Sequence, residues 1–165
     1  PASRELLVTT DGAEEVIGGV ILDDETMRQK APDGTPVAKL LEAKGIVPGI
    51  KVDTGAKPLA LAEGETVTEG LDALRERLAE YRGLGARFAK WRATYSISDT
   101  LPSEYCMWTN AHALSRYAAL CQEAGIVPIV GPEVLMAGDH PIEPSFLHTS
   151  SVLIAVFAEP APQQV

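Results

Sequence analysis

The sequence predicts an α/β fold, in which helices cover the faces of a parallel β-sheet. Short apolar runs of strand length alternate along the chain with longer segments whose apolar residues recur at helical spacing. Glycine and proline clusters separate these segments, so the order of the elements is βαβαβαβα. Strands that are joined through helices pair in parallel, because the connecting helix returns the chain to the same end of the sheet. The predicted strands are 16–22, 46–53, 86–92 and 126–133.

The first half of the chain begins with a predicted buried strand. The run 16–22 is continuously apolar, which is typical of a strand buried on both faces. Asp23, Asp24 and Glu25 follow it and could be ligands at the strand end. We favour the N-terminus of a helix, where carboxylates stabilise the helix dipole. Residues 37–44 then predict a short helix that ends at a glycine.

The remaining elements are three helices and two loops. Residues 71–81 carry leucines and a tyrosine at helical spacing, which predicts an amphipathic helix. Longer helices are predicted over 102–124 and 146–159. The segments 54–58 and 64–70 are rich in turn residues and are expected to be loops.

Two histidines are candidates for acid–base chemistry, and we favour structural roles for both. His112 lies inside the predicted helix 102–124, where a histidine is more often a packing or surface residue than a catalyst. Asp139 and His140 are adjacent in a predicted loop, and adjacent side chains rarely face each other. We therefore expect a turn at this pair rather than an acid–base site.

Composition and charge limit the classes of function. The 165 residues are expected to form a single domain, 1–165. The net charge of −9 argues against binding to nucleic acid or anionic membranes, because phosphate surfaces repel such a chain. No apolar run approaches the roughly 18 residues of a membrane span, and no signal pattern is seen. Cys106 and Cys121 lack metal-ligand spacing, so we expect reduced thiols, a cytoplasmic protein and no metal.

Charged residues collect where three of the predicted strands end. Lys90 and Arg92 point to one face of their strand, because side chains alternate between faces. Lys51 lies near the end of the second strand and Glu133 at the end of the fourth. Each could be a strand end that surfaces into solvent. Because barrel and open α/β enzymes place their chemistry at the carboxyl ends of parallel strands, a shared site is the better interpretation.

Several long motifs, in the same order, resemble one enzyme family. The chain resembles class I fructose-bisphosphate aldolase from about residue 3 to residue 158. The motifs are Gly45–Asp53 (GIVPGIKVD), Gly64–Asp72 (GETVTEGLD), Phe88–Arg92 (FAKWR), Ile126–Val130 (IVPIV), Leu6–Thr10 (LLVTT) and Gly138–His140 (GDH). The family fold is a closed (β/α)₈ barrel, and the chain resembles about strands 2–5 of it. The resemblance therefore implies a partial barrel.

The resemblance also implies a reaction and a set of site residues. The reaction is reversible cleavage of fructose 1,6-bisphosphate into dihydroxyacetone phosphate and glyceraldehyde 3-phosphate through a lysine Schiff base, without a cofactor or metal. Lys90 and Arg92 would contact the substrate phosphate and the reacting carbons, with Lys51 beside them. Glu133 would pair with these lysines, so that Lys90 and Glu133 are the implied catalytic residues.

The departures from the family pattern imply that the 165-residue chain is inactive by itself. The family's Schiff-base lysine belongs to a Leu-Leu-Lys-Pro segment that this sequence does not contain. Gly131 stands where the family has an acid–base glutamate. Two alternatives stay open: a non-enzymatic half-barrel that binds a phosphorylated sugar or a partner chain, and residual imine chemistry at Lys90 or Lys51. A homo-oligomer, or association through exposed sheet edges, is expected because four strands cannot close the barrel.

Overall fold

The structure is a computed structural model that describes residues 10–135 and 141–158. The elements, in chain order, are η1 (Ala13–Glu15), β1 (Gly19–Leu22), α2 (Asp24–Arg28), α3 (Val37–Ala43), β2 (Val47–Lys51), β3 (Gly55–Pro58), β4 (Thr66–Glu69), α4 (Leu74–Leu84), β5 (Phe88–Tyr95), α5 (Glu104–Glu123), β6 (Val127–Val134) and α6 (Ile142–Ala158). The turn predicted at Asp139-His140 lies outside the described residues.

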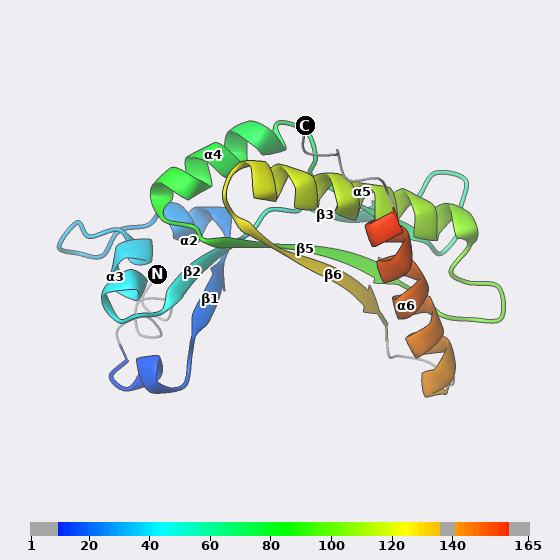
Figure 1. Cartoon of the computed structure of the whole chain (residues 1–165), viewed down its shortest axis with the longest axis horizontal. Helices are drawn as coiled ribbons and strands as arrows, with labels where there is room; N and C mark the ends of the chain where they lie inside the picture. The colour runs from blue at the N-terminus through cyan, green and yellow to red at the C-terminus, as the bar shows by residue number, and fades with distance from the viewer. Residues whose placement is uncertain (1–9, 136–140, 159–165) are drawn as a thin grey trace. The chain divides into compact units, whose positions relative to one another are not determined.

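The predicted parallel sheet is confirmed. Its strand order is β1-β2-β5-β6, and both β1 with β2 and β2 with β5 pair in parallel (Figure 1). The four strands overlap the apolar runs that predicted them, and β1 and β6 are the two edges of the sheet. Strand β5 continues to Tyr95, so Lys90 and Arg92 lie within it rather than at its predicted carboxyl end. No helix within 10–135 and 141–158 has the length and apolar character that crossing a bilayer requires.

The chain divides into two compact units, which are described separately. Unit 1 comprises Pro1–Val52, Leu74–Lys90 and Cys121–Ile129, and unit 2 comprises Asp53–Ala73, Trp91–Leu120 and Val130–Val165. Strands β5 and β6 and helix α5 begin in one unit and end in the other.

In unit 1, helices α2 and α3 pack against β1 and β2. The acidic start of α2 is confirmed, because the Asp23 carboxylate caps the helix by accepting a hydrogen bond of 2.7 Å from the Thr26 N–H. The prediction that the first strand is buried on both faces is wrong. Leu22 is buried on the side of the helices, whereas Ile21 on the other side is 44% exposed. The described residues of unit 1 leave this second face of the edge strand partly open.

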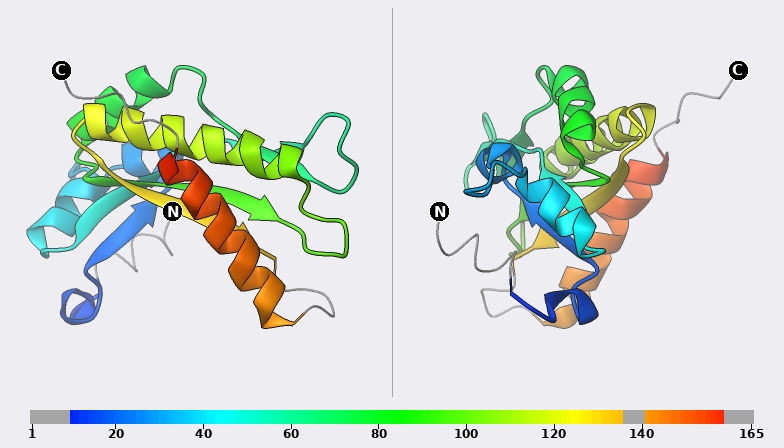
Figure 2. Two further views of the ribbon diagram at one scale, coloured as in Figure 1. Left: turned by 45° about the vertical axis from the view of Figure 1, so that its right-hand side comes forward. Right: turned by 90° about the vertical axis from the view of Figure 1, so that its left-hand side faces the viewer.

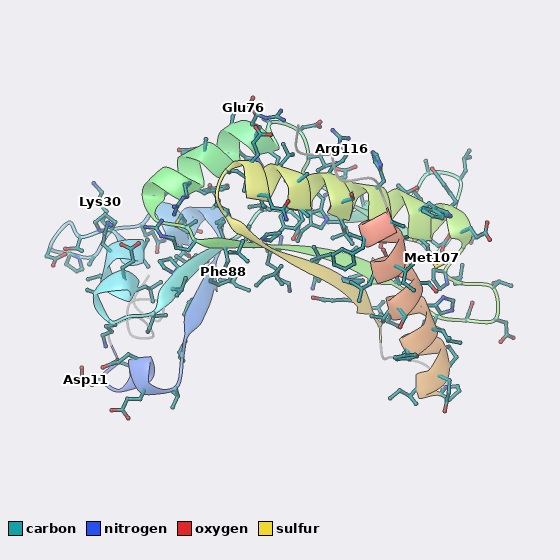
Figure 3. All side chains as sticks on the ribbon, in the orientation of Figure 1. Asp11, Lys30, Glu76, Phe88, Met107 and Arg116 are labelled. Carbon is teal, nitrogen blue, oxygen red and sulfur yellow. The ribbon has the colours of Figure 1, made fainter. Side chains whose placement is uncertain are left out.

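Close approach of β2 and β5 in unit 1 depends on a glycine. Gly49 and Phe88 are register partners, and a Cβ built on Gly49 would lie 2.3 Å from the Phe88 ring. Figure 3 labels Phe88 at the start of β5. A larger residue at position 49 would force this ring out of its place, so the sequence needs glycine here.

In unit 2, the two segments predicted to be loops form an antiparallel hairpin. Strands β3 and β4 pair from Gly55↔Glu69 to Pro58↔Thr66, which corrects the prediction for 54–58 and 64–70. Both segments are rich in turn-forming residues, so their local propensity for strands is weak. They form strands because residues far away in the sequence provide hydrogen bonds to them. The buried Asn110 of α5 accepts a hydrogen bond of 3.1 Å from the Thr68 N–H and donates one of 2.9 Å to the Thr66 carbonyl.

The three longer helices lie where they were predicted, with shifted boundaries: α4 ends at Leu84 instead of residue 81, and α6 begins at Ile142 instead of residue 146. α4 begins at Leu74 instead of residue 71, because Gly70 and Ala73 have positive φ angles of 130° and 51° and cannot continue a helix. Helix α5 buries one apolar face: Ala118 is half-buried, and the fully buried members are Ala113, Leu114, Tyr117 and Cys121. His112 is exposed, as expected of a surface histidine.

The last helix, α6, buries only some of its apolar side chains. Val152 and Val156 are buried, whereas Leu147 and Phe157 are 61% and 78% exposed. In both views of Figure 2, α6 (orange to red) passes close to the carboxyl end of β6.

Replacing Asn110 with alanine should destabilise the fold by about 2–4 kcal/mol, because the Thr68 N–H would lose its partner and the Thr66 carbonyl would keep only the weak donor Sγ of Cys106. The measurement is the free energy of unfolding in urea. The control is Arg116→Ala on the same helix, whose side chain is exposed (Figure 3) and whose loss should cost less than about 0.5 kcal/mol. Equal losses in the two variants would contradict the proposed role of Asn110.

Acid should remove a stabilising contribution of Asp24. A hydrogen bond from the Tyr81 hydroxyl, with the ion pair to Arg28, holds the pKa of the Asp24 carboxyl below its ordinary value. The contribution is therefore complete above about pH 4, the ordinary pKa, and is lost as the pH falls through the lower folded pKa. Asp24→Asn should be less stable than the natural chain at pH 7, and the difference should shrink in acid. Urea unfolding from pH 7 to pH 3 measures this, with Asp11→Asn, an exposed residue labelled in Figure 3, as the control. A difference that stays constant with pH would refute it.

Candidate functional site

The predicted alternation of side chains along β5 is confirmed. Ala89 and Trp91 are fully buried on one face of the strand, whereas Lys90 is half-buried and Arg92 exposed on the other. Trp91 is held in unit 2 by the Tyr117 ring, whose centroid lies 5.5 Å away. The buried face anchors the strand, so the opposite face can present its two cationic side chains.

In unit 1, the structure brings Lys51 and Lys90 together. They are register partners in the parallel ladder of β2 and β5, at the carboxyl end of β2. Register partners on parallel strands lie about 4.8 Å apart and point to the same face of the sheet. The pair therefore places two half-buried ammonium side chains side by side.

Beyond Lys51, both peptide groups of Val52 have partners within unit 1. The Val52 N–H donates a hydrogen bond of 3.1 Å to the Lys90 carbonyl, which is the last rung of the ladder. The Val52 carbonyl accepts a hydrogen bond of 2.9 Å from Nη1 of Arg77, on α4. The end of β2 is thus fixed by a strand on one side and by a side chain on the other.

In unit 2, a buried carboxylate organises the backbone. Asp53 is 7% exposed, and its Oδ1 accepts a hydrogen bond of 3.1 Å from the Gly55 N–H. Its Oδ2 accepts a longer one of 3.4 Å from the Arg92 N–H. Asp53 therefore ties the start of β3 to β5, a role that its position after a strand did not reveal.

The structure also brings two of the predicted site residues, Arg92 and Glu133, together in unit 2. Nε of Arg92 lies 3.7 Å from Oε2 of Glu133, and the two side chains are 44% and 41% exposed. This distance is an ion pair rather than a hydrogen bond, and such exposed pairs contribute about 0–1 kcal/mol. A guanidinium has five N–H donors, so Arg92 keeps the capacity to bind an anion beside Glu133.

Sequence reasoning missed the part played by Gly70. Its φ of +130° suits glycine, and a Cβ there would lie 3.0 Å from the Thr54 nitrogen and 3.1 Å from the Asp53 Cα. The backbone after β4 therefore packs directly on the segment that carries Asp53. The signal in the sequence is a glycine directly after a run of β-branched residues, in a segment whose turn residues predict a loop.

The described residues offer little for a metal ion or a reactive thiol. Within 10–135 and 141–158, no group of three or more His, Cys, Asp and Glu residues is placed to hold a metal. Both cysteines are buried, and burial raises the pKa of the Cys106 thiol to about 11. Cys106 is therefore a neutral thiol at pH 7 and a poor nucleophile.

The comparisons with known proteins agree with one another. A family model described as "Glycolytic: Fructose-bisphosphate aldolase class-I" matches residues 2–165. The chain is 59% identical over 156 residues to a "Probable fructose-bisphosphate aldolase class 1" of Xanthomonas campestris pv. campestris, covering 94% of this chain and 47% of the relative. It is 50% identical over 156 residues to "Fructose-bisphosphate aldolase 6, cytosolic" of Arabidopsis thaliana, covering 94% and 44%.

The fold is similar to a solved aldolase structure as well. The structure of fructose-bisphosphate aldolase from Plasmodium falciparum in complex with TRAP and a small molecule inhibitor matches with a TM-score of 0.89 and 43% identity, covering 94% of this chain and 46% of that one. The chain spans about half the length of the relatives it matches. The resemblance drawn from the motifs is confirmed: this chain belongs to the class I fructose-bisphosphate aldolase family, and its parallel β/α units match a portion of that family's barrel.

Proposed function

We propose that this chain supplies part of the sugar-phosphate site of a class I fructose-bisphosphate aldolase. The observation that carries the proposal is the register of Lys51 with Lys90 at the carboxyl end of β2. Carboxyl ends of parallel strands are where α/β barrels bind and transform their substrates. Two ammonium groups there give a net −9 chain a local place for a phosphorylated ligand.

The proposed reaction is the cleavage of fructose 1,6-bisphosphate into dihydroxyacetone phosphate and glyceraldehyde 3-phosphate. In this reaction, Lys90 and Arg92 contact the substrate phosphate and the reacting carbons, and Lys51 adds positive charge beside Lys90. A guanidinium can grip a phosphate through two parallel hydrogen bonds. Glu133, whose Oε2 lies 3.7 Å from Nε of Arg92, supplies a carboxylate that can accept and return protons. A lysine that forms a Schiff base with the ketone completes the family's chemistry.

The 165-residue chain by itself is proposed to bind without turnover. The sequence holds no Leu-Leu-Lys-Pro segment, the family setting of the Schiff-base lysine, and Gly131 has no carboxylate. We also propose a cytoplasmic location, which the name of the cytosolic Arabidopsis thaliana relative supports. The alternative is a non-enzymatic module that binds a phosphorylated sugar or a partner chain. This alternative predicts the same binding, but no cleavage by any longer protein that contains this chain.

The isolated chain should bind fructose 1,6-bisphosphate weakly, with a dissociation constant in roughly the millimolar range, and should not cleave it. Binding should weaken as salt rises, because exposed charges are screened. The double variant Lys90→Ala with Arg92→Ala should lose at least about tenfold in affinity. Calorimetric titration and a coupled cleavage assay measure the two quantities.

The matched control removes one lysine and one arginine elsewhere. Lys30 and Arg116 are both exposed (Figure 3), so Lys30→Ala with Arg116→Ala changes the net charge equally. If both double variants bind as the natural chain does, the phosphate site lies elsewhere. Cleavage near a normal enzyme rate would overturn the proposal that the chain needs a further segment.

We further propose that the isolated chain associates through its sheet edges, as a homo-oligomer or by aggregation. Strands β1 and β6 end the sheet, and an edge strand presents unpaired backbone groups to other chains. Val127 and Ile129 on β6 are 64% and 42% exposed, which adds apolar surface at one edge. Light scattering on dilute protein should give a mass above that of one 17.6 kDa chain. A monomer that unfolds in one sharp transition would be the contrary result.

A further inference from the structure

A chain of side-chain contacts in unit 1 runs from the surface of α2 and α4 to the end of β2. Its members alternate in charge except for one neutral hydroxyl. In order they are Glu80, Arg28, Asp24, Tyr81 and Arg77, and the last contact is made to the Val52 carbonyl. We call this series of contacts the Arg77 network.

The outer half of the Arg77 network is a clamp between two helices. Nη1 and Nη2 of Arg28 each donate a hydrogen bond to the Glu80 carboxylate, the second at 2.9 Å. Nε of Arg28 donates to Oδ1 of Asp24 at 2.9 Å. The Arg28 guanidinium also lies 5.8 Å from the centre of the Tyr81 ring. These contacts fix α2, which starts directly after β1, against α4.

The inner half leads from Asp24 to the strand. The Tyr81 hydroxyl donates a hydrogen bond of 2.8 Å to Oδ1 of Asp24 and accepts one from Arg77. Tyr81 is 2% exposed, so its hydroxyl is held between these two charged groups with little water around the ring. Arg77 then donates to the Val52 carbonyl at 2.9 Å. A hydrogen bond from a charged donor is stronger than a neutral one, which favours a fixed position for this carbonyl.

The hydrogen bonds of Val52 hold the end of β2 directly after Lys51. The Val52 N–H belongs to the peptide that joins Val52 to Lys51, and it donates a hydrogen bond to the Lys90 carbonyl on β5. In the next peptide, the Val52 carbonyl accepts a hydrogen bond from Arg77. These two hydrogen bonds flank Val52, so the backbone at Val52, directly after Lys51, has little freedom to rotate. Lys51 is itself paired with Lys90 in the ladder, so the strand end that carries its side chain is held by β5 and by Arg77.

We propose that Arg77 is a positioning residue for Lys51, held in place through Tyr81 and Asp24. Arg77 does not touch the ligand; it sets the direction in which the end of β2 presents its lysine. This proposal rests on the proposed function, because the value of a fixed Lys51 is the binding of a sugar phosphate. A loose lysine would bind the same anion with lower affinity, since its ordering would cost entropy on binding.

The test uses the whole 165-residue chain with its lysines reductively methylated by ¹³C-formaldehyde. The NMR signal of the methylated Lys51 is assigned by its loss in Lys51→Arg, and it reports the surroundings of that side chain without any catalysis. Affinity for fructose 1,6-bisphosphate is measured on unmethylated protein. Arg77→Met removes the donors and keeps the apolar stem, and Tyr81→Phe removes only the hydroxyl. The control is Arg75→Met, on the same helix as Arg77. It breaks the exposed ion pair in which Nε of Arg75 lies 2.8 Å from Oε1 of Glu123.

Arg77→Met should shift the Lys51 signal and weaken binding by about fivefold to tenfold. Tyr81→Phe should act in the same direction to a smaller extent, and Arg75→Met should change neither quantity. Lowered stability with an unmoved Lys51 signal would mean that Arg77 has a structural role only, which overturns the proposal. If Arg77→Met does not fold, Tyr81→Phe decides by the same signal. Absence of binding by the natural chain would refute the proposed function, and the Lys51 signal would still decide whether Arg77 positions that lysine.

Discussion

The register between β2 and β5 is the constraint on which the rest of unit 1 depends. Gly49 opposite Phe88 begins the pairing, and Lys51 opposite Lys90 ends it. Because side chains alternate along a strand, a shift of one residue would turn one of these lysines to the helix-covered face. Gly49 leaves room for the aromatic ring, so the close pairing of the strands and the placement of the two cations have one origin.

In unit 2, a buried carboxylate holds the backbone in place, as the pairing of β2 and β5 does in unit 1. Asp53 accepts from two backbone N–H groups, and the close approach of Gly70 holds the segment that carries it. Arg92 is thereby tied at its own N–H and keeps its side chain at the surface beside Glu133. In both units, buried contacts of the backbone set the direction of a charged side chain. This division is typical of sites in which a rigid scaffold presents polar groups to a ligand.

Much of this arrangement could be predicted from the sequence, because it follows from local patterns. The four strands and the shared face of Lys90 and Arg92 come from apolar runs and from alternation, which are properties of a few neighbouring residues. The hairpin of β3 and β4 could not be predicted, since its strands are short and depend on Asn110, more than forty residues away. The contact of Arg77 with Val52 is equally long-range: the sequence shows only a charge on an amphipathic helix.

The central claim, that this chain forms part of an aldolase site, is tested most directly in a full-length relative. The 156 residues that align would replace the matching segment of the Xanthomonas campestris protein, and cleavage of fructose 1,6-bisphosphate would be measured. We predict that the chimera with Gly131→Glu, which restores the acid–base carboxylate, cleaves within about tenfold of the parent protein, and that adding Lys90→Ala costs on the order of 100-fold or more. A folded chimera that binds the sugar phosphate without cleaving it, or that is indifferent to Lys90→Ala, would contradict it.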